Sequence, residues 1–542
     1  MGFRLAVLGI LIFGLFGYLL TGLYRLQIQN GDLYAARAAN QIALAGLLKS
    51  SRGSIYITDK DGEHIPVALN RAYPAIIAAP AEIANPDEVM DTFADFLKID
   101  RVKLSELLSK KGDLYEIVKS RVTEEEVQSV RQVGFKGIYI DEQESRFYPF
   151  NELGAHLIGF LGPDDAGGFS GKYGIEAMYE DALKGVEGRA EKDQYARPVL
   201  GQDIFLTIDR NIQERAEEIL GTLVTTYGAK GGTVIVEEPK TGKILAFGNY
   251  PTFNPNTYNN FPLSRFLNPA VQAIYEPGSI LKVVTMSAGI DSGAITPQTT
   301  YVDYGEARVK DRVIKNFDGK TYGLSTMTEV IEHSINTGAV FAEKATGHET
   351  FYSYLTQFGF GEKTGVGLPG ELKGSLKPLA SSPKSDVQYA TASFGQGISV
   401  TPIQLLQAVA AIANNGVLMK PILLVEDAPT VVRRVVSETT AKQVTDMMIS
   451  AVEEGKIAGI PEYRIAGKTG TAQVPDFARG GYSKDVVNTY IGFGPASNPR
   501  FIILIKIDQP EGALLAGQTV VPAFRELAQF ILNYHNIPPD DL

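Results

Sequence analysis

The chain has 542 residues, more than one ordinary domain holds, so we expect two or three folded units. Its 51 basic and 62 acidic residues give a net charge of −11, which argues against a protein that binds nucleic acid through a basic surface. Zero cysteines exclude disulfides, thiolate nucleophiles and cysteine zinc sites, and only five histidines remain as metal ligands.

The N-terminus predicts a membrane anchor over residues 1–24. Leu5–Tyr24 contains twenty residues without a charge, enough for a helix that crosses a hydrocarbon core of about 30 Å. A cleaved signal peptide has a shorter apolar stretch, and the small residues at Ala36-Arg37-Ala38 lie too far downstream. We therefore expect the span to be retained. The charges of Arg4 on one flank and of Arg25 and Arg37 on the other leave its orientation open.

Residues 25–200 predict an extended module of mixed α and β structure. Polar helical stretches are expected at Asp87–Leu97 and Thr123–Val133. Short strand-like runs alternate with glycine-rich turns, at Tyr73–Ala79, Tyr115–Val118 and Gly137–Ile140. The pattern changes near Ala196-Arg197-Pro198, and we place a domain boundary between residues 195 and 205.

Residues 201–542 predict one continuous α+β domain. It opens with a helix over Asp209–Thr226, which has one apolar face, and a terminal helix is expected over Pro522–Tyr534. Five strands are expected between these helices, at Gly232–Glu237, Lys243–Asn249, Arg464–Gln473, Val487–Gly494 and Phe501–Asp508. Two strands at the start and three at the end indicate one antiparallel sheet that distant parts of the chain close.

A candidate nucleophile lies where a Pro-Gly turn enters the apolar run Ile280–Ile290. Ser279 and Lys282 are three residues apart on one helical face, so the ammonium can reach the hydroxyl. Burial of this lysine would lower its pKa, and a neutral amine can act as a base toward the serine. The second Ser-x-x-Lys of the chain, Ser381-Ser382-Pro383-Lys384, carries a proline in a turn-rich stretch and serves as an internal decoy.

Acyl transfer at Ser279 would need two further elements. Ser334-Ile335-Asn336, the only Ser-x-Asn, lies between helical stretches at Thr326–His333 and Thr337–Ala345, and Asn336 could simply cap the second of them. Lys-Thr-Gly occurs three times, and two copies, at Lys240 and Lys363, are expected in turns. Only Lys468-Thr469-Gly470-Thr471 continues an extended pattern, so it can offer a strand edge and a cation to a substrate.

In this order, Ser279-x-x-Lys282, Ser334-x-Asn336 and Lys468-Thr469-Gly470 resemble the three motifs of penicillin-binding proteins and serine β-lactamases. Further segments resemble motifs of class B penicillin-binding proteins, so that the resemblance covers nearly the whole chain: Arg52-Gly53-Ser54-Ile55, Arg146-Phe147-Tyr148-Pro149 with His156, Gly171-x-x-Gly174-x-Glu176 through Leu183-x-Gly185, Asn268-Pro269-Ala270-Val271, and Phe394-Gly395-Gln396-Gly397 with Thr401-Pro402.

The resemblance implies a bitopic protein of the bacterial plasma membrane. It would have a short cytoplasmic tail and one transmembrane helix within residues 1–24, an α+β pedestal of the dimerisation type at 25–200, and an extracytoplasmic D,D-transpeptidase domain at 201–542. The last would have the penicillin-binding and β-lactamase-like α+β fold, an antiparallel sheet with helices on both sides. The implied substrate is the D-Ala-D-Ala end of peptidoglycan stem peptides, β-lactams would acylate the same serine, and no cofactor or metal is required.

The family mechanism can be carried onto matching residues. Ser279 would attack the penultimate carbonyl, Lys282 would act as the base, and Ser334 would relay protons. Asn336 would bond the amide of the substrate. Lys468, Thr469, Gly470 and Thr471 would bind the terminal carboxylate, with the N–H groups of Ser279 and Thr471 as the oxyanion hole. His156 and Glu176 would have structural roles.

The subtype rests on fewer residues. Glu276-Pro277-Gly278-Ser279 resembles the division-type, FtsI-like enzymes, which implies septal cell-wall synthesis and a polytopic glycosyltransferase partner like FtsW. An elongation-type transpeptidase and a D,D-carboxypeptidase or β-lactamase that uses water as acceptor remain alternatives. A non-catalytic divisome scaffold and a β-lactam sensor are alternatives of another class. The intact motifs disfavour the scaffold, and a tail of four residues leaves no room for a signalling domain.

Overall fold

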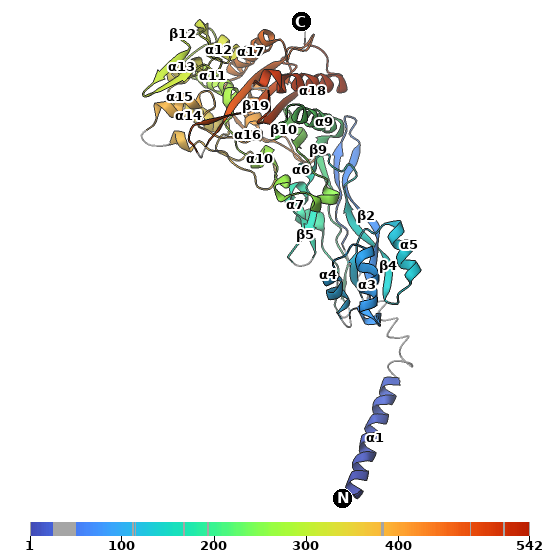
Figure 1. Ribbon diagram of the computed structural model, residues 1–542. Coiled ribbons are helices and arrows are strands. Elements are labelled where there is room, and N and C mark those ends of the chain that lie inside the picture. The colour runs from blue at the N-terminus through green and yellow to red at the C-terminus, as the bar shows by residue number, and fades with distance from the viewer. Residues whose placement is uncertain are drawn as a thin grey trace. The chain divides into compact units, whose positions relative to one another are not determined.

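A computed structural model of the chain (Figure 1) describes residues 2–24, 50–110, 113, 115–165, 168–191, 194–380, 384–476, 479–512 and 515–540. The chain divides into two compact units. One consists of residues 1–53 and 181–202, and the other of residues 54–180 and 203–542.

The first unit contains the helix α1 (Gly2–Tyr24) and the antiparallel hairpin of β7 (Arg189–Glu191) and β8 (Gln194–Ala196). Gly201 allows two stretches of main chain to pack closely in this unit. Its N–H donates to Ser51 O at 2.9 Å, and a Cβ at this position would clash with main-chain atoms. The side chains of residues 1–11, with which the predicted membrane span begins, lie outside the described residues. Within the described part, we find no helix that is both long and apolar enough to cross a membrane.

The pedestal half of the second unit is built on a five-stranded sheet. Its strand order is β3-β2-β1-β9, with β4 paired to β2, and the strands are β1 (Ile55–Thr58), β2 (His64–Ala78), β3 (Glu116–Lys119), β4 (Ile138–Phe147) and β9 (Ile204–Asp209). The helices α3 (Pro86–Phe96), α4 (Arg101–Leu108) and α5 (Glu124–Val133) bury their apolar faces against this sheet. Thr123 and Glu126 form the capping box that begins α5, as the sequence predicts. The expected strands and helices of this region are therefore confirmed.

A buried ion pair joins two of the pedestal motifs named in the sequence within this unit. Arg146 Nε lies 2.6 Å from Glu176 Oε1, and both side chains are at most 3% exposed. Tyr148 also donates to Glu176 at 3.3 Å, and burial lowers the pKa of His156 to about 4. These residues lie among the short elements β5 (Leu161–Pro163), β6 (Phe169–Gly171), α6 (Ala155–Ile158) and α7 (Gly174–Met178). Their contacts bear out the structural role expected for His156 and Glu176.

The second half of this unit is organised around one antiparallel sheet. Its strand order is β11-β10-β20-β19-β18. The strands are β10 (Gly231–Glu238), β11 (Lys243–Tyr250), β18 (Ala466–Pro475), β19 (Tyr482–Gly494) and β20 (Phe501–Asp508). Since β10 pairs with β20, the first hairpin and the last three strands form a single sheet, which confirms the predicted closure.

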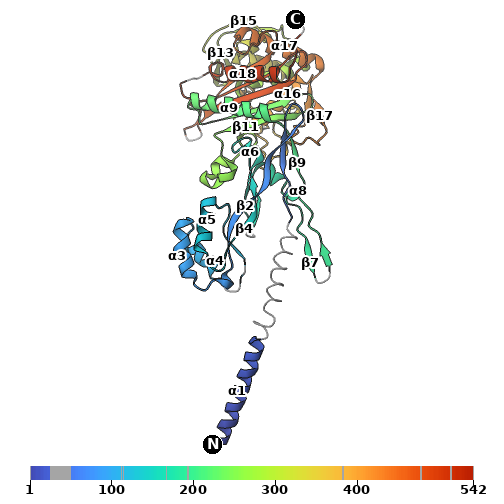
Figure 2. The same ribbon diagram turned by 90° about the vertical axis from the view of Figure 1, so that its right-hand side faces the viewer.

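Helices cover both faces of this sheet (Figures 1 and 2). On one face, α9 (Arg210–Thr226) and α18 (Val520–Tyr534) pack into an apolar core with residues of β10, β19 and β20. On the other face, α16 (Pro402–Ala413) contacts β10, β19 and β20 and is buried along its whole length. The predicted N-terminus of α9 is also confirmed, because Asp209 caps it by accepting from the N–H groups of Asn211 and Ile212.

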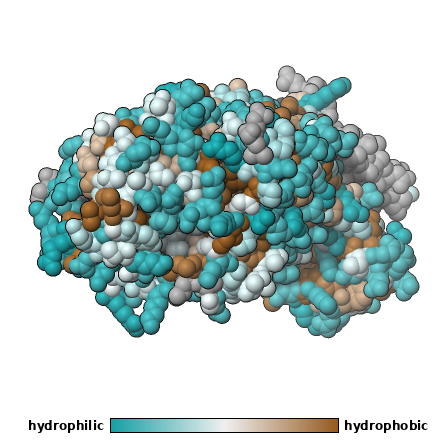
Figure 3. Space-filling view, turned by 90° about the horizontal axis from the view of Figure 1, so that it is seen from above, coloured by the Kyte–Doolittle hydropathy of each residue, from teal (hydrophilic) through white to brown (hydrophobic). Residues whose placement is uncertain are grey.

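The chain between β11 and β18 supplies the remaining elements. The described helices there are α10 (Pro269–Gln272), α11 (Lys282–Asp291), α12 (Met327–Glu332), α13 (Asn336–Thr346), α14 (His348–Gln357), α15 (Asp386–Ala392) and α17 (Glu438–Gly455). Short strands form three two-stranded sheets from β12 (Thr300–Asp303) with β15 (Gly323–Thr326), β13 (Glu306–Val309) with β14 (Arg312–Lys315), and β16 (Val417–Met419) with β17 (Val431–Arg434). Viewed from above, hydrophilic residues dominate the surface and hydrophobic ones form small separate patches (Figure 3).

Candidate active site

The predicted nucleophile lies at a tight entrance to a buried helix. Ser279 belongs to the short 3-10 helix η5 (Gly278–Leu281), which runs directly into α11. Gly278 has φ +58°, and a Cβ there would lie 3.1 Å from Ala472 Cβ and 3.3 Å from Thr471 O. A glycine is therefore needed both for the left-handed conformation and for the close approach of β18. As a result, the main chain of Thr471 lies beside the residue that precedes Ser279.

Lys282 Nζ contacts all the hydroxyl and amide groups that the sequence singled out near it. Ser279 Oγ lies at 3.0 Å, Asn336 Oδ1 at 2.8 Å, Ser334 O at 2.5 Å and Ser334 Oγ at 3.2 Å. The carbonyl and the amide oxygen only accept hydrogen bonds, so they take two N–H groups of this amine. In a neutral amine the lone pair is then left for the O–H of Ser279.

The environment of Lys282 favours this neutral form. The side chain is fully buried among α11 residues and their neighbours. Burial, and then the nearby positive charge of Lys468, hold the pKa of Lys282 well below its ordinary value. An unprotonated lysine within hydrogen-bonding distance of a serine hydroxyl is an arrangement that can activate the serine as a nucleophile.

Ser334 lies between the two lysines. It has φ +57° in the turn that joins α12 and α13, a conformation that is costly for a residue with a Cβ. This turn aims its hydroxyl at both amines, since Lys468 Nζ lies 3.0 Å from Ser334 Oγ. The hydroxyl can accept a proton from one amine and donate to the other, so it connects them.

Asn336 does not have the helix-capping role that the sequence left open. Helix α13 begins at Asn336 itself and Ile335 occupies the N-cap, so Asn336 does not cap the helix. Its Oδ1 accepts from Lys282, and its Nδ2 donates to Lys315 O at 3.0 Å. The orientation of the amide is thereby fixed, and one N–H remains for another acceptor. The capping box of Thr326 and Glu329 at the start of α12 is present as predicted.

The strand that carries Lys468 lies at the edge of the central sheet. β18 pairs only with β19 among the described strands, so its other edge is available for an extended ligand. Lys468 is buried, and burial lowers its pKa to about 7. Its Nζ lies 3.2 Å from Thr469 O and 3.4 Å from Thr469 Oγ1, while Thr471 Oγ1 accepts from the N–H of Ala516 at 3.2 Å.

Close packing also explains the small residue in this strand. A Cβ at Gly470 would lie 3.0 Å from Ile280 Cγ1 and 3.2 Å from Pro277 O. The strand and the nucleophile segment can therefore approach each other only where the side chain is absent. The predicted oxyanion hole, formed by the N–H groups of Ser279 and Thr471, stays a prediction.

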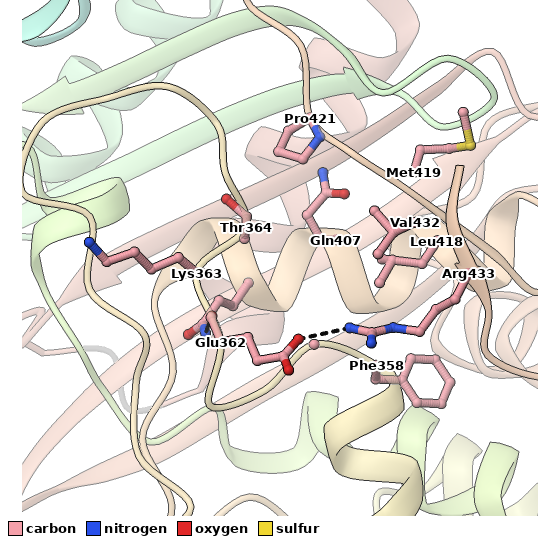
Figure 4. Close-up of a pocket in the computed structure, with 12 residues that line it drawn as sticks. Phe358, Glu362, Lys363, Thr364, Gln407, Leu418, Met419, Pro421, Val432 and Arg433 are labelled. Carbon is pink, nitrogen blue, oxygen red and sulfur yellow. Dashed lines mark hydrogen bonds and ion pairs between the residues drawn. The ribbon is translucent and has the colours of Figure 1, made fainter. Parts of the chain in front are cut away.

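The competing motifs lie elsewhere in the fold. Lys240-Thr241-Gly242 forms the turn between β10 and β11, as predicted, with Gly242 at φ +79°. Lys363 and Thr364 lie in a loop that lines a small cavity of about 70 Å³ beside α16, where Glu362 pairs with Arg433 at 2.9 Å (Figure 4). Ser381, the serine of the decoy motif, lies outside the described residues. Of the three Lys-Thr-Gly copies, the third is the one whose lysine contacts Ser334.

The sequence did not predict two sets of contacts in the site, although Glu276 was singled out there as part of the Glu-Pro-Gly-Ser segment. Glu276 accepts from the N–H of Gly397 at 2.9 Å and from Tyr482 Oη at 3.0 Å, so it joins the nucleophile segment to a loop and to the start of β19. Behind Asn336, the side-chain oxygen of Asn316 accepts its N–H at 3.1 Å. Only the position of Glu276, directly before the Pro-Gly-Ser turn, offered a signal. No group of three side chains suited to a metal ion is found in the described ranges.

Comparisons with known proteins agree with this geometry. The family model of the penicillin binding protein transpeptidase domain matches residues 232–529, and that of the penicillin-binding protein dimerisation domain matches residues 47–204. Stage V sporulation protein D of Bacillus subtilis is 31% identical to this chain, over 95% of this chain and 83% of its own length. The peptidoglycan D,D-transpeptidase FtsI of Escherichia coli is 29% identical, over 97% and 90%. The crystal structure of penicillin binding protein 3 from Mycobacterium tuberculosis with aztreonam is similar at a TM-score of 0.70 and 27% identity, over 91% of this chain and 98% of that one.

Proposed function

The chain belongs to the penicillin-binding protein transpeptidase family, and on that premise we propose that Ser279 is the nucleophile with which it cross-links peptidoglycan stem peptides. The activity is that of a D,D-transpeptidase, a serine acyltransferase that β-lactams inactivate. The observation that carries the choice of residues is the contact of Lys282 Nζ with Ser279 Oγ, Ser334 and Asn336 together.

Acylation begins with the proton of Ser279. Lys282 Nζ, 3.0 Å away, takes this proton while Ser279 Oγ attacks the carbonyl of the penultimate D-Ala. A tetrahedral intermediate forms, with its oxyanion directed to the N–H groups of Ser279 and Thr471. The bond to the terminal D-Ala then breaks, and the leaving amine needs a proton.

Ser334 provides the path for that proton. Its hydroxyl lies 3.2 Å from Lys282 Nζ and 3.0 Å from Lys468 Nζ, so a proton can pass from the charged Lys282 through Ser334 to the leaving nitrogen. The remaining N–H of Asn336 bonds the carbonyl of the substrate amide. A second stem peptide then attacks the acyl-enzyme through its amine, and the same groups run in reverse.

Lys468 and its strand hold the substrate. The free edge of β18 can pair with the extended peptide, and the cation of Lys468 with the hydroxyls of Thr469 and Thr471 can bind its terminal carboxylate. Binding of an anion also restores the charged form of Lys468, whose pKa burial lowers to about 7. A carboxypeptidase or β-lactamase would use the same groups with water, but neither activity accounts for the pedestal.

Labelling with a fluorescent penicillin tests the nucleophile. The wild-type chain should carry one adduct on the peptide that contains Ser279, and Ser279→Ala should abolish it. Ser381→Ala provides a matched control, since it removes the serine of the other Ser-x-x-Lys motif and should label normally. Adducts that survive Ser279→Ala would refute the assignment. Rapid loss of the wild-type adduct would instead indicate a β-lactamase.

We also propose that the chain acts in septal wall synthesis from the bacterial plasma membrane. The sequence around Ser279 and the relative named FtsI support the septal role, and the uncharged stretch Leu5–Tyr24 supports a single-pass anchor with the enzyme outside. Depletion should then give filamentous cells, whereas rounded cells would indicate an elongation enzyme.

The anchor also suggests a partner, a polytopic glycosyltransferase like FtsW that contacts the span and the pedestal. Such a partner should co-purify with the full chain and not with residues 25–542. Equal recovery with both would argue against a role for the span. Fractionation of the full chain into soluble extract without detergent would argue against the anchor itself.

A further inference from the structure

The half-buried side chain of Glu276, three residues before Ser279, lies where three segments of the chain meet. Its Oε1 accepts from the N–H of Gly397 at 2.9 Å, and its Oε2 accepts from Tyr482 Oη at 3.0 Å. Gly397 belongs to the loop between α15 and α16, and Tyr482 is the first residue of β19. The acyl transfer described above uses neither Glu276 nor Tyr482.

The loop is already joined to the nucleophile segment, residues 275–279, by main-chain contacts. Tyr275 and Val400 exchange two main-chain hydrogen bonds, at 2.9 and 3.0 Å, and the N–H of Gly278 donates to Gly395 O at 3.2 Å. A Cβ at Gly395 would lie 2.2 Å from Gly278 O, so no side chain fits between the two segments. The bond from the loop to Glu276 reinforces a junction that the main chain makes by itself.

The nucleophile segment and β18 are joined differently. They touch where Gly278 faces Thr471 and where Gly470 faces Ile280, and no main-chain hydrogen bond connects the two segments among the described residues. Apolar packing has little directional preference, whereas a hydrogen bond has a preferred distance and angle. Packing therefore brings β18 close to Ser279, and the directional bonds that align the strand come from side chains.

Two side-chain contacts tie the ends of β18 to the site. Near the start of the strand, Lys468 Nζ lies 3.0 Å from Ser334 Oγ. At its end, Pro475 pairs with Tyr482 across the hairpin, and the hydroxyl of Tyr482 donates to Glu276. The first contact lies beside the proposed base, and the second lies beside the turn that leads to the nucleophile. Both ends of β18 are thus referred to the same catalytic cluster.

We propose that Glu276 is a positioning residue for acylation, because it holds β18 beside Ser279 through Tyr482. Thr471 lies midway between the two points at which the strand is held. The inference rests on the proposed function, in which the N–H groups of Ser279 and Thr471 bind the oxyanion. Loss of the contact leaves the nucleophile and its base in place, and it displaces a group that stabilises the developing charge.

Stopped-flow acylation by a fluorescent penicillin separates the dissociation constant of the first complex from the rate constant of acylation. Glu276→Ala should lower the rate constant at least about tenfold, since a displacement of about 1 Å can cost about 100-fold. Tyr482→Phe removes one hydrogen bond at a position that is 41% exposed, and it should lower the rate constant about 3- to 10-fold. The dissociation constant should change less than about twofold in both, because Ser334 still holds Lys468.

Three further variants make the measurement specific. Glu276→Gln can accept from Gly397 through its oxygen and donate to the Tyr482 oxygen through its nitrogen, so its rate constant should stay within about threefold of the wild type. Tyr304→Phe removes the hydroxyl of a side chain that is 75% exposed and lies outside the site, and it should acylate normally. The double variant Glu276→Ala, Tyr482→Phe should be no more than about twofold slower than Glu276→Ala, because both changes remove the same bond.

Three kinetic results would overturn the positioning role. They are a wild-type rate constant in Glu276→Ala or in Tyr482→Phe, effects of the two changes that multiply in the double variant, and an effect on the dissociation constant alone. Circular dichroism melting shows whether each variant is folded. Should Glu276→Ala fail to fold, Tyr482→Phe at its exposed position decides the question.

Hydrogen exchange followed by mass spectrometry tests the cause. Peptides from β18 should exchange faster in Glu276→Ala than in Glu276→Gln, while peptides from β10 should exchange equally in the two. Equal exchange of β18 in both variants would overturn the proposal. Should the wild-type chain form no penicillin adduct, the proposed function fails, and the exchange of β18 still decides whether Glu276 holds that strand.

Discussion

A buried carboxylic acid in the central sheet should make the stability of the protein depend on pH. Glu237 on β10 is fully buried against α16, and the one hydrogen bond that its carboxyl group makes among the described residues is donated by Gln407 Nε2. Glu237 Oε1 and Gln407 Oε1 have no partner there. Since no cation among the described residues compensates the carboxylate, burial raises the pKa of Glu237 from 4.5 to about 8. Glu237→Gln removes this titration and preserves the shape.

The direction of the pH dependence follows from the protonation of Glu237 in the folded and in the unfolded chain. Below pH 4.5 the acid carries its proton in the folded and in the unfolded chain, so it favours neither. Above pH 4.5 the unfolded chain releases the proton while folded Glu237 keeps it until about pH 8. Stability therefore falls by about 1.4 kcal/mol per pH unit across this window, and the full difference is on the order of 5 kcal/mol. At position 237 an amide can donate to Gln407 Oε1 and accept from Gln407 Nε2, so the variant satisfies both groups.

Calorimetric melting of both proteins between pH 5 and pH 8 checks this. The variant should exceed the wild type by little at pH 5 and by roughly 5–10 °C at pH 8. Glu238→Gln, one residue further along the strand and not fully buried, removes the same charge and should give a difference that does not grow with pH. Parallel melting curves of Glu237→Gln and the wild type across this range would refute the reasoning, because Glu237 would then be ionised in the folded protein.

The other predictions concern the site and the pedestal. Gly278→Ala should slow penicillin acylation at least about tenfold in stopped-flow assays with circular dichroism unchanged, because its Cβ would lie 3.1 Å from Ala472; a normal rate would show that the turn can shift. Since burial lowers the pKa of Lys468 to about 7, the acylation rate constant should fall above pH 7. Lys468→Arg should move that fall to higher pH, because an arginine keeps its charge. Identical pH–rate profiles of the variant and the wild type would contradict this. Arg146→Met should lower the free energy of unfolding by about 3–5 kcal/mol in calorimetry, because it leaves Glu176 charged and buried. The double variant Arg146→Met, Glu176→Leu should recover most of this loss. An equal loss of stability in the single and the double variant would contradict the ion pair as the cause.

Helices and strands with a clear hydrophobic periodicity could be predicted closely from the sequence. The last strand, Phe501–Asp508, has the expected bounds, and α9 differs from its prediction by one residue because Asp209 is the cap. The apolar run after Ser279 forms a helix buried on all sides, as its composition indicates. In the site, the spacing of Ser279 and Lys282 was enough, since residues three apart on a helix meet.

The rest of the site depends on contacts that no local pattern carries. The hydroxyl of Ser334 is aimed by a backbone angle of +57°, which a Ser-x-Asn motif does not reveal. Asn336 could be expected as a cap by propensity, but its side chain bonds Lys282, because a buried amine needs acceptors more than a helix end needs that amide. Asn316 and Glu276 contribute through loops, whose paths the sequence pattern does not determine.

The pairing of β10 with β20 sets the order in which the protein can mature. More than 260 residues are synthesised between the end of β10 and the start of β20. Until β20 has been made, β18 and β19 cannot pair into the sheet. The segment around Ser279 can fold earlier, but β18, the strand that faces it, cannot yet be held in place by the sheet. Nascent chains released before residue 508 should therefore be inert toward penicillin, and the enzyme becomes a drug target only in the last moments of its own synthesis.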